Sequence, residues 1–168
     1  MHVLAIDSNE DLRRGSRQIC FTYSSELATD PQTLLARQCL ASVNTELSPF
    51  KMSAPPDWRH KPITQWPVQK RLFHSWILLF GFLPLDRHSF RLQRIRSDGF
   101  DEASTSIINR AWRHQRTIDS TATGCCITDT LCYECRLPLL GILLQPLYRL
   151  VFKRRHRYLR RHFGTPTL

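Results

Sequence analysis

The stretch that decides the fold runs from Arg110 to Phe163 and opens with RAWRHQRTI, residues 110–118. Polar and apolar side chains alternate there, and the alternation returns over residues 125–133, CCITDTLCY, after a polar break at residues 119–124. Period two over these lengths predicts two half-buried strands joined as a hairpin. One face of the hairpin would carry Trp112, His114, Arg116, Ile118, Ile127, Asp129, Leu131 and Tyr133.

After Pro138 the spacing of the apolar residues changes from two to that of a helix, and Gly164 and Pro166 end the run. We expect its inner stripe to contain Leu140, Leu144, Leu147, Val151, Tyr158 and Phe163. Arg154, Arg157 and Arg161 recur at spacings of three and four, so they should share the outer face. A sheet with one apolar face and a helix with one apolar stripe can close over a shared interior.

The residues upstream supply the rest of the predicted sheet. Residues 18–24 alternate as a strand, Asp30-Pro31 begins a helix that Pro49 ends, and a short strand follows at 49–53. A proline-rich connection at 54–67 leads to strands at 72–83, 88–96 and 100–108, with a tight turn at Ser97-Asp98-Gly99. The expected domain therefore spans residues 16–164, between a flexible arm at 1–15 and a tail at 165–168.

The 168 residues carry a net charge of +10, and basic residues gather on the last helix. Such a face is either solvated surface or a contact for an anionic partner, for which we favour a membrane over nucleic acid. The longest apolar stretch, 137–152, is too short and too interrupted to span a bilayer. None of the six cysteines fits a disulfide framework or a zinc motif, so we expect free thiols and a cytoplasmic location, in part peripheral at the membrane.

Several local motifs resemble bacterial members of the START-like, birch-pollen-allergen superfamily, also called SRPBCC or polyketide cyclase/dehydrase. They are NTELSP at 44–49 with Met52, WILLFG at 76–81 with Pro84 and Asp86, WRHQR at 112–116, Thr128-Asp129, and residues 152–163. The resemblance implies an α+β helix-grip fold, in which a seven-stranded antiparallel sheet wraps around a long C-terminal helix. It also implies a cavity between them for an apolar small molecule or lipid.

The candidate ligand-binding residues are Trp76, Phe90, Trp112, His114, Arg116, Asp129 and Leu131. Parity across the hairpin places Asp129 beside His114 or Arg116, either as a polar anchor for a ligand carboxylate or carbonyl, or as a cross-strand pair that only fixes register. Asp86 and His88 form a second polar pair, for acid–base chemistry or for capping a strand entry. No motif for a nucleophile, phosphate or metal stands out, so no catalytic residue, cofactor or metal is assigned.

Three functions stay open on the sequence. The leading hypothesis is non-catalytic binding of an apolar small molecule or lipid. The first alternative is a cyclase, dehydrase or hydrolase acting on a ketide-like substrate, and the second is binding of an anionic surface through the basic helix. The oligomeric state and the identity of the ligand do not follow from the sequence.

Overall fold

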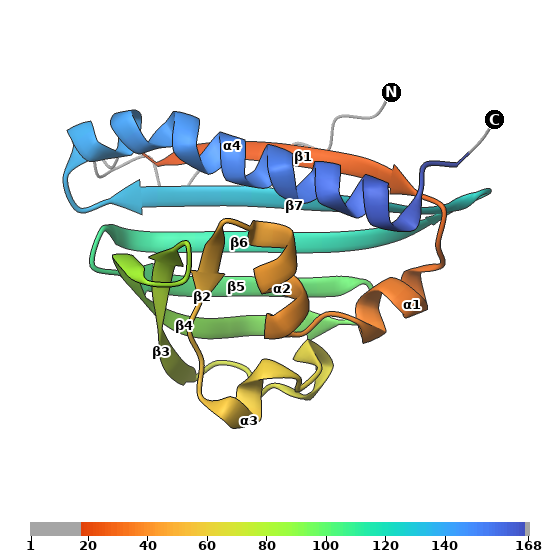
Figure 1. The fold of residues 1–168 in the computed structure, drawn as a ribbon, viewed down its shortest axis with the longest axis horizontal. Coiled ribbons are helices and arrows are strands. Elements are labelled where there is room, and N and C mark those ends of the chain that lie inside the picture. Colours follow the sequence, from red (N-terminus) through yellow and green to blue (C-terminus); the bar gives the residue numbers. More distant parts are fainter. Residues whose placement is uncertain (1–17, 167–168) are drawn as a thin grey trace, which may run out of the picture.

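A computed structural model describes residues 18–166, and it shows an antiparallel sheet of seven strands against one long helix (Figure 1). The chain runs β1 (Ile19–Leu27), α1 (Pro31–Ala36), α2 (Leu40–Leu47), β2 (Phe50–Met52), α3 (Pro56–Arg59), η1 (Ile63–Gln65), β3 (Arg71–Leu79), β4 (Leu83–Arg96), β5 (Gly99–Ser106), β6 (Asn109–Thr121), β7 (Gly124–Cys135) and α4 (Pro138–Phe163). The predicted α+β helix-grip architecture is confirmed. The arm expected at 1–15 lies outside the described residues.

The sheet has the order β1-β7-β6-β5-β4-β3-β2, so the first strand pairs with the last. All neighbours are antiparallel, and β3 to β7 follow one another as consecutive hairpins. The β6–β7 hairpin pairs Arg116 with Asp129 and Trp112 with Tyr133. This register puts the predicted apolar and polar residues of both strands on the inner face, as the alternation required.

Helix α4 covers the inner face of the sheet along β1 and β7 and also contacts α2 (Figure 1). Its predicted lengthwise division is confirmed, since Arg154, Arg157 and Arg161 are exposed while the six expected inner residues are half-buried. One basic residue departs from the pattern: Arg155 is only 3% exposed and points inward with His156. No helix of residues 18–166 is long and apolar enough to cross a membrane.

Two of the expected elements are divided in the structure. The helix expected from Pro31 to Pro49 is split into α1 and α2, because the helix is interrupted at residues 37–39, where the Gln38 carbonyl accepts from the Ile63 N–H. The apolar run 72–83 contains a turn at 80–82, where Phe80 (φ 54°) and Gly81 (φ 82°) are left-handed. The run is therefore the end of one strand and the start of the next.

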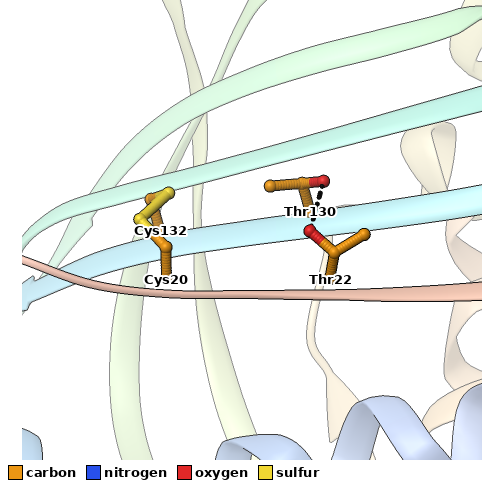
Figure 2. The surroundings of a disulfide bond; sticks show 4 residues. All are labelled: Cys20, Thr22, Thr130 and Cys132. Carbon is orange, nitrogen blue, oxygen red and sulfur yellow. Dashed lines mark hydrogen bonds between the residues drawn. A yellow bond between two sulfur atoms is a disulfide. The ribbon is translucent and has the colours of Figure 1, made fainter. Parts of the chain in front are cut away.

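The expectation of six free thiols is wrong, because Cys20 of β1 and Cys132 of β7 form a disulfide (Figure 2). The two residues are direct partners in the antiparallel register, with Cα atoms 4.1 Å apart. On the same face, Thr22 Oγ1 and Thr130 Oγ1 are hydrogen-bonded at 3.0 Å. The prediction considered Cys132 only with Cys135, on the same strand, and overlooked the partner across the sheet. The cytoplasmic location thereby loses its free-thiol argument and stays a prediction.

Candidate functional site

A cavity of about 310 Å³ lies between the inner face of the sheet and the helices α2 and α4. Most of its wall is apolar, with contributions from Leu40, Val43, Phe90, Phe100, Trp112 and Val151. The polar side chains on the wall include Asp86, His88, Glu102, His114 and Arg155. A concave apolar space with a few convergent polar groups is the usual form of a small-molecule site.

Three of the seven predicted site residues, Phe90, Trp112 and His114, line this cavity. Arg116, Asp129 and Leu131 are each 0% exposed, yet they lie behind the wall and do not line it. Trp76 does not fit the prediction, because it is 43% exposed on the outer face of the sheet. On that face it pairs with Arg87 of the neighbouring strand, whose guanidinium packs over the indole ring. The continuous apolar run of β3 gave no alternation from which its inner face could be read.

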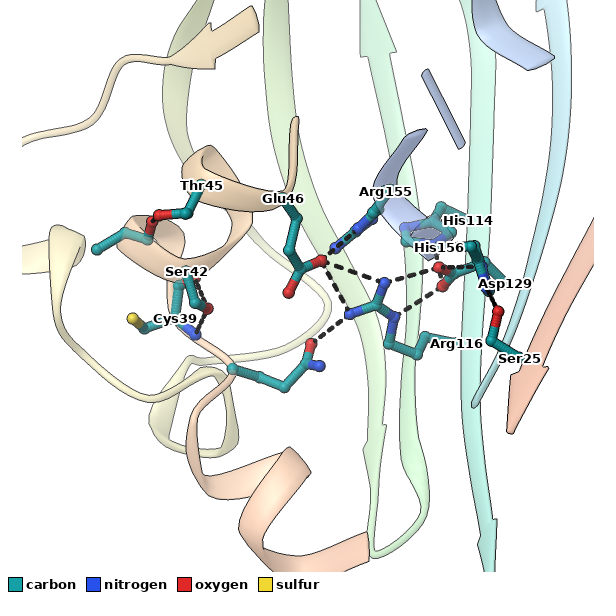
Figure 3. A network of polar contacts seen from close by, with 12 residues as sticks. Ser25, Cys39, Ser42, Thr45, Glu46, His114, Arg116, Asp129, Arg155 and His156 are labelled. Atoms are coloured by element: carbon teal, nitrogen blue, oxygen red, sulfur yellow. Dashed lines mark hydrogen bonds and ion pairs between the residues drawn. The ribbon is translucent and has the colours of Figure 1, made fainter. Parts of the chain in front are cut away.

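Asp129 is the centre of a buried cluster of charged side chains, and the predicted contacts to it are confirmed (Figure 3). Arg116 donates two hydrogen bonds to its carboxylate, from Nε at 2.7 Å and from Nη2 at 2.6 Å. His114 Nε2 lies 2.9 Å from Oδ1, and His156 Nε2 lies 3.1 Å from Oδ2. Sequence parity anticipated the first two partners but not the histidine from α4.

The cluster continues from Arg116 toward α2 and α4 (Figure 3). Arg116 Nη1 donates to Gln38 at 3.1 Å, and both terminal nitrogens lie 3.5 Å from Glu46 Oε2. Arg155 donates its Nε–H to the same Glu46 oxygen. The sheet, α2 and α4 are therefore joined through alternating positive and negative groups.

The sequence prediction missed Glu46, Glu102, Arg155 and His156, and only the last two carried a signal. Phe152, Arg155, His156 and Leu159 follow the spacing i, i+3, i+4, i+7 of one helix face, and all four are buried. Arg155 and His156 sit between two apolar members of that stripe. Periodicity alone would have placed them inside, against the expectation that charge belongs outside.

Asp86 and His88 do not form the expected pair, although both line the cavity. Asp86 Oδ1 accepts from the backbone N–H groups of Arg87 at 2.8 Å and Ile108 at 3.3 Å, which matches the capping alternative. His88 Nε2 instead lies 2.8 Å from Glu102 Oε1 of the neighbouring strand. Glu102 thus joins His88 to the cluster, since its Oε2 is 3.6 Å from His114 Nδ1.

The buried carboxylates of the cluster are held in their charged form. Burial raises the pKa of Glu102, but the contacts with His114 and His88 outweigh it and lower the pKa to about 2. Burial likewise acts to raise the pKa of Asp129 and of Glu46. The charges of Arg116 for Asp129, and of Arg155 and Arg116 for Glu46, outweigh it and lower both pKa values, that of Asp129 well below 3.8.

The architecture is a helix-grip fold, and several solved structures share it. A protein from Chromobacterium violaceum matches with a TM-score of 0.59 and 10% identity, over 83% of this chain and 96% of that chain. A START superfamily protein from Mycobacterium smegmatis matches with a TM-score of 0.53 and 10% identity, over 87% and 96%. Ara h 8.0201 matches with a TM-score of 0.51 and 10% identity, over 84% and 97%.

At the level of sequence, the chain belongs to the family described as Domain of unknown function (DUF8410), whose model matches residues 25–163. No curated protein matches the sequence. At 10% identity the solved structures establish the fold alone. Any function must therefore be argued from the cavity and the charged cluster.

The lowered carboxylate pKa values predict acid sensitivity. A carboxyl whose pKa is lower in the folded protein is stabilising above its unfolded pKa, and this contribution is lost as the pH falls through the folded value. For Glu102 that window runs from about 4.5 down to about 2. We expect the free energy of unfolding, measured with denaturant, to fall across this window, and to fall less steeply in Glu102→Gln.

Asp57→Asn, which removes an exposed carboxylate of α3, is the control and should keep the slope of the unmodified protein. In this range the unfolded chain takes up about one proton for each carboxyl whose pKa is lowered by folding, which favours the unfolded state. A free energy of unfolding that stays constant between pH 5 and pH 2 would therefore contradict the charge assignment.

Proposed function

We propose that the protein binds an apolar small molecule or lipid in the cavity between sheet and α4, without transforming it. The observation that carries this proposal is the cavity itself, whose wall is mostly apolar and whose volume is about 310 Å³. Filling such a space with an apolar ligand removes apolar surface from water, which is favourable in proportion to the area buried. Phe90, Trp112 and His114 are the predicted site residues that would touch the ligand.

The arrangement of the charged cluster also supports the proposal. Arg116 and Asp129 are sealed away from the cavity and satisfied by each other, so they act as structure and not as the polar anchor for a ligand carboxylate. The ligand would meet only the edge of the cluster, at His88, Glu102, His114 and Arg155. The binding energy is then mainly hydrophobic, with orientation set by a few polar atoms.

A cyclase, dehydrase or hydrolase acting on a ketide-like substrate is the catalytic alternative, and Asp86, His88 and His114 on one cavity wall favour it. Each of the three side chains already has one polar atom in a hydrogen bond, however: to backbone N–H groups for Asp86, to Glu102 for His88 and to Asp129 for His114. A general base needs its acceptor atom within hydrogen-bond reach of the proton it removes. We therefore rank catalysis behind binding.

Cavity filling tests the binding proposal. Val151 lines the cavity and its neighbour Leu150 is 51% exposed on the outside of α4, so Val151→Trp and Leu150→Trp form a matched pair. We expect native mass spectrometry to find apolar molecules on the purified protein and on Leu150→Trp, and to find them lost from Val151→Trp. An apolar fluorescent dye should likewise bind to the unmodified protein and to Leu150→Trp, and should not bind to Val151→Trp.

Circular dichroism would confirm that both variants fold. Folded protein without adducts or dye binding, or equal binding by the two variants, would refute the proposal.

A contact with an anionic membrane is a second candidate, and the outer face of α4 favours it. Its first half exposes Leu139, Leu143 and Leu150, and its second half exposes Arg154, Arg157 and Arg161 on the same helical side. An apolar segment that continues into a basic one suits the boundary between acyl chains and anionic head groups. This contact would bring the cavity to a source of apolar ligands.

Reversing the three arginines to glutamate should abolish binding to vesicles that contain phosphatidylserine at low salt. Screening by added salt should weaken binding of the unmodified protein, because the contact is electrostatic. The matched control reverses Arg91, Arg94 and Arg113, three exposed arginines on the outer face of the sheet, for the same change in net charge. If both triple variants lose vesicle binding equally, the binding depends on net charge and not on the face of α4. If the unmodified protein does not bind the vesicles, the contact is excluded.

A further inference from the structure

Glu102 is a buried carboxylate on the cavity wall, and one of its oxygens has no hydrogen-bond partner among the described residues. Glu102 is 6% exposed, and its Oε1 accepts from Ser104 Oγ at 2.6 Å and from His88 Nε2 at 2.8 Å. Its Oε2 has only His114 Nδ1 nearby, at 3.6 Å, which is beyond hydrogen-bond distance. The two donors on Oε1 fix the carboxylate, so Oε2 is held in place beside the His114 ring but without a hydrogen bond.

That oxygen is open to the cavity. Within residues 18–166 the one buried side-chain polar atom that is both sealed and unpartnered is Ser75 Oγ. Glu102 Oε2 is unpartnered but not sealed, and Glu102 lines the cavity, as does His114. A charged oxygen in a low-dielectric wall with no donor costs free energy, and a donor placed there by a ligand recovers it.

His114 determines which kind of donor fits. Its Nε2 faces the ionised Asp129 and must donate there, so Nδ1 is the atom left toward Glu102. The rings of Phe100 and Phe152 pack edge-on against the imidazole, with centroids at 5.4 and 5.3 Å. The space beside Glu102 Oε2 and His114 Nδ1 is therefore polar at one point and aromatic around it.

From this geometry we infer that the ligand carries a hydroxyl group, a phenol or an alcohol, which sits in the cavity beside Glu102 Oε2 and His114 Nδ1, within hydrogen-bond reach of both. A hydroxyl both donates and accepts, so it gives its hydrogen to Glu102 and can accept from Nδ1 when that nitrogen is protonated. An ether offers no hydrogen and leaves Oε2 unpartnered. This inference rests on the proposed function and specifies the class of ligand for the same cavity.

The charge of the cluster disfavours an anionic head group. Its three carboxylates, Glu46, Glu102 and Asp129, already share the donors of two arginines and three histidines, and a ligand carboxylate beside Glu102 Oε2 would add a fourth negative charge next to an ionised one. Like charges in a site of low dielectric repel strongly. Arg155 also lines the cavity and is the one group that would favour an anion, although its Nε–H is already given to Glu46.

Three naphthalenes of similar size test the inference by calorimetry at pH 7: 2-naphthol, 2-methoxynaphthalene and 2-naphthoate. We expect 2-naphthol to bind about tenfold more tightly than the methoxy compound, the factor that 1.4 kcal/mol gives for one hydrogen bond to a charged acceptor. Naphthoate should bind most weakly. In Glu102→Gln the preference for naphthol should shrink to less than about threefold while the affinity for the methoxy compound stays.

Asp57→Asn is the control, because Asp57 is an exposed carboxylate of α3 that does not line the cavity. It should keep the preference for naphthol. Equal binding of naphthol and the methoxy compound to the unmodified protein would overturn the hydroxyl site and leave the apolar cavity intact. Tightest binding of naphthoate would overturn it in favour of Arg155, and no binding of any naphthalene would argue against the cavity as a binding site. The unmodified protein decides among these outcomes even if Glu102→Gln does not fold.

Discussion

The bidentate ion pair between Arg116 and Asp129 is the constraint on which the rest of the structure depends. Both side chains are 0% exposed, and a buried charge without its partner costs several kcal/mol. The pair sits on β6 and β7, but other elements supply further hydrogen-bond partners. His156 of α4 contacts Asp129, and Gln38 and Glu46 of the α1–α2 region contact Arg116. The sheet thus requires both helices in order to satisfy its own central charges.

The cavity follows from that arrangement. The cluster holds α2 and α4 against the sheet at one end, and Arg155 and His114 are shared between the cluster and the cavity wall. Most of the remaining wall is aromatic and aliphatic, and the buried carboxylate of Glu102 in it keeps one oxygen without a hydrogen bond. A rigid polar end and an apolar body are what a binding site needs to orient one molecule without covalent chemistry.

The sequence was informative where side chains alternate regularly. Parity along 110–118 and 125–133 located Asp129 beside His114 and Arg116, and helical spacing located the exposed arginines of α4. It failed where a pattern was uniform or the partner was distant. The apolar run of β3 hid that Trp76 faces outward, and Cys20 lies 112 residues from Cys132. Glu46 and Glu102 gave no sign of burial because their partners come from other elements.

A double-mutant cycle on Arg116 and Asp129 tests the central claim most directly. Arg116→Met, Asp129→Leu and the double variant would be compared by their free energies of unfolding. Each single change strands a buried charge and should cost about 3–5 kcal/mol. The double variant should be more stable than the sum of the two losses predicts, by more than about 1 kcal/mol. Strictly additive losses, or single variants as stable as the unmodified protein, would contradict the account.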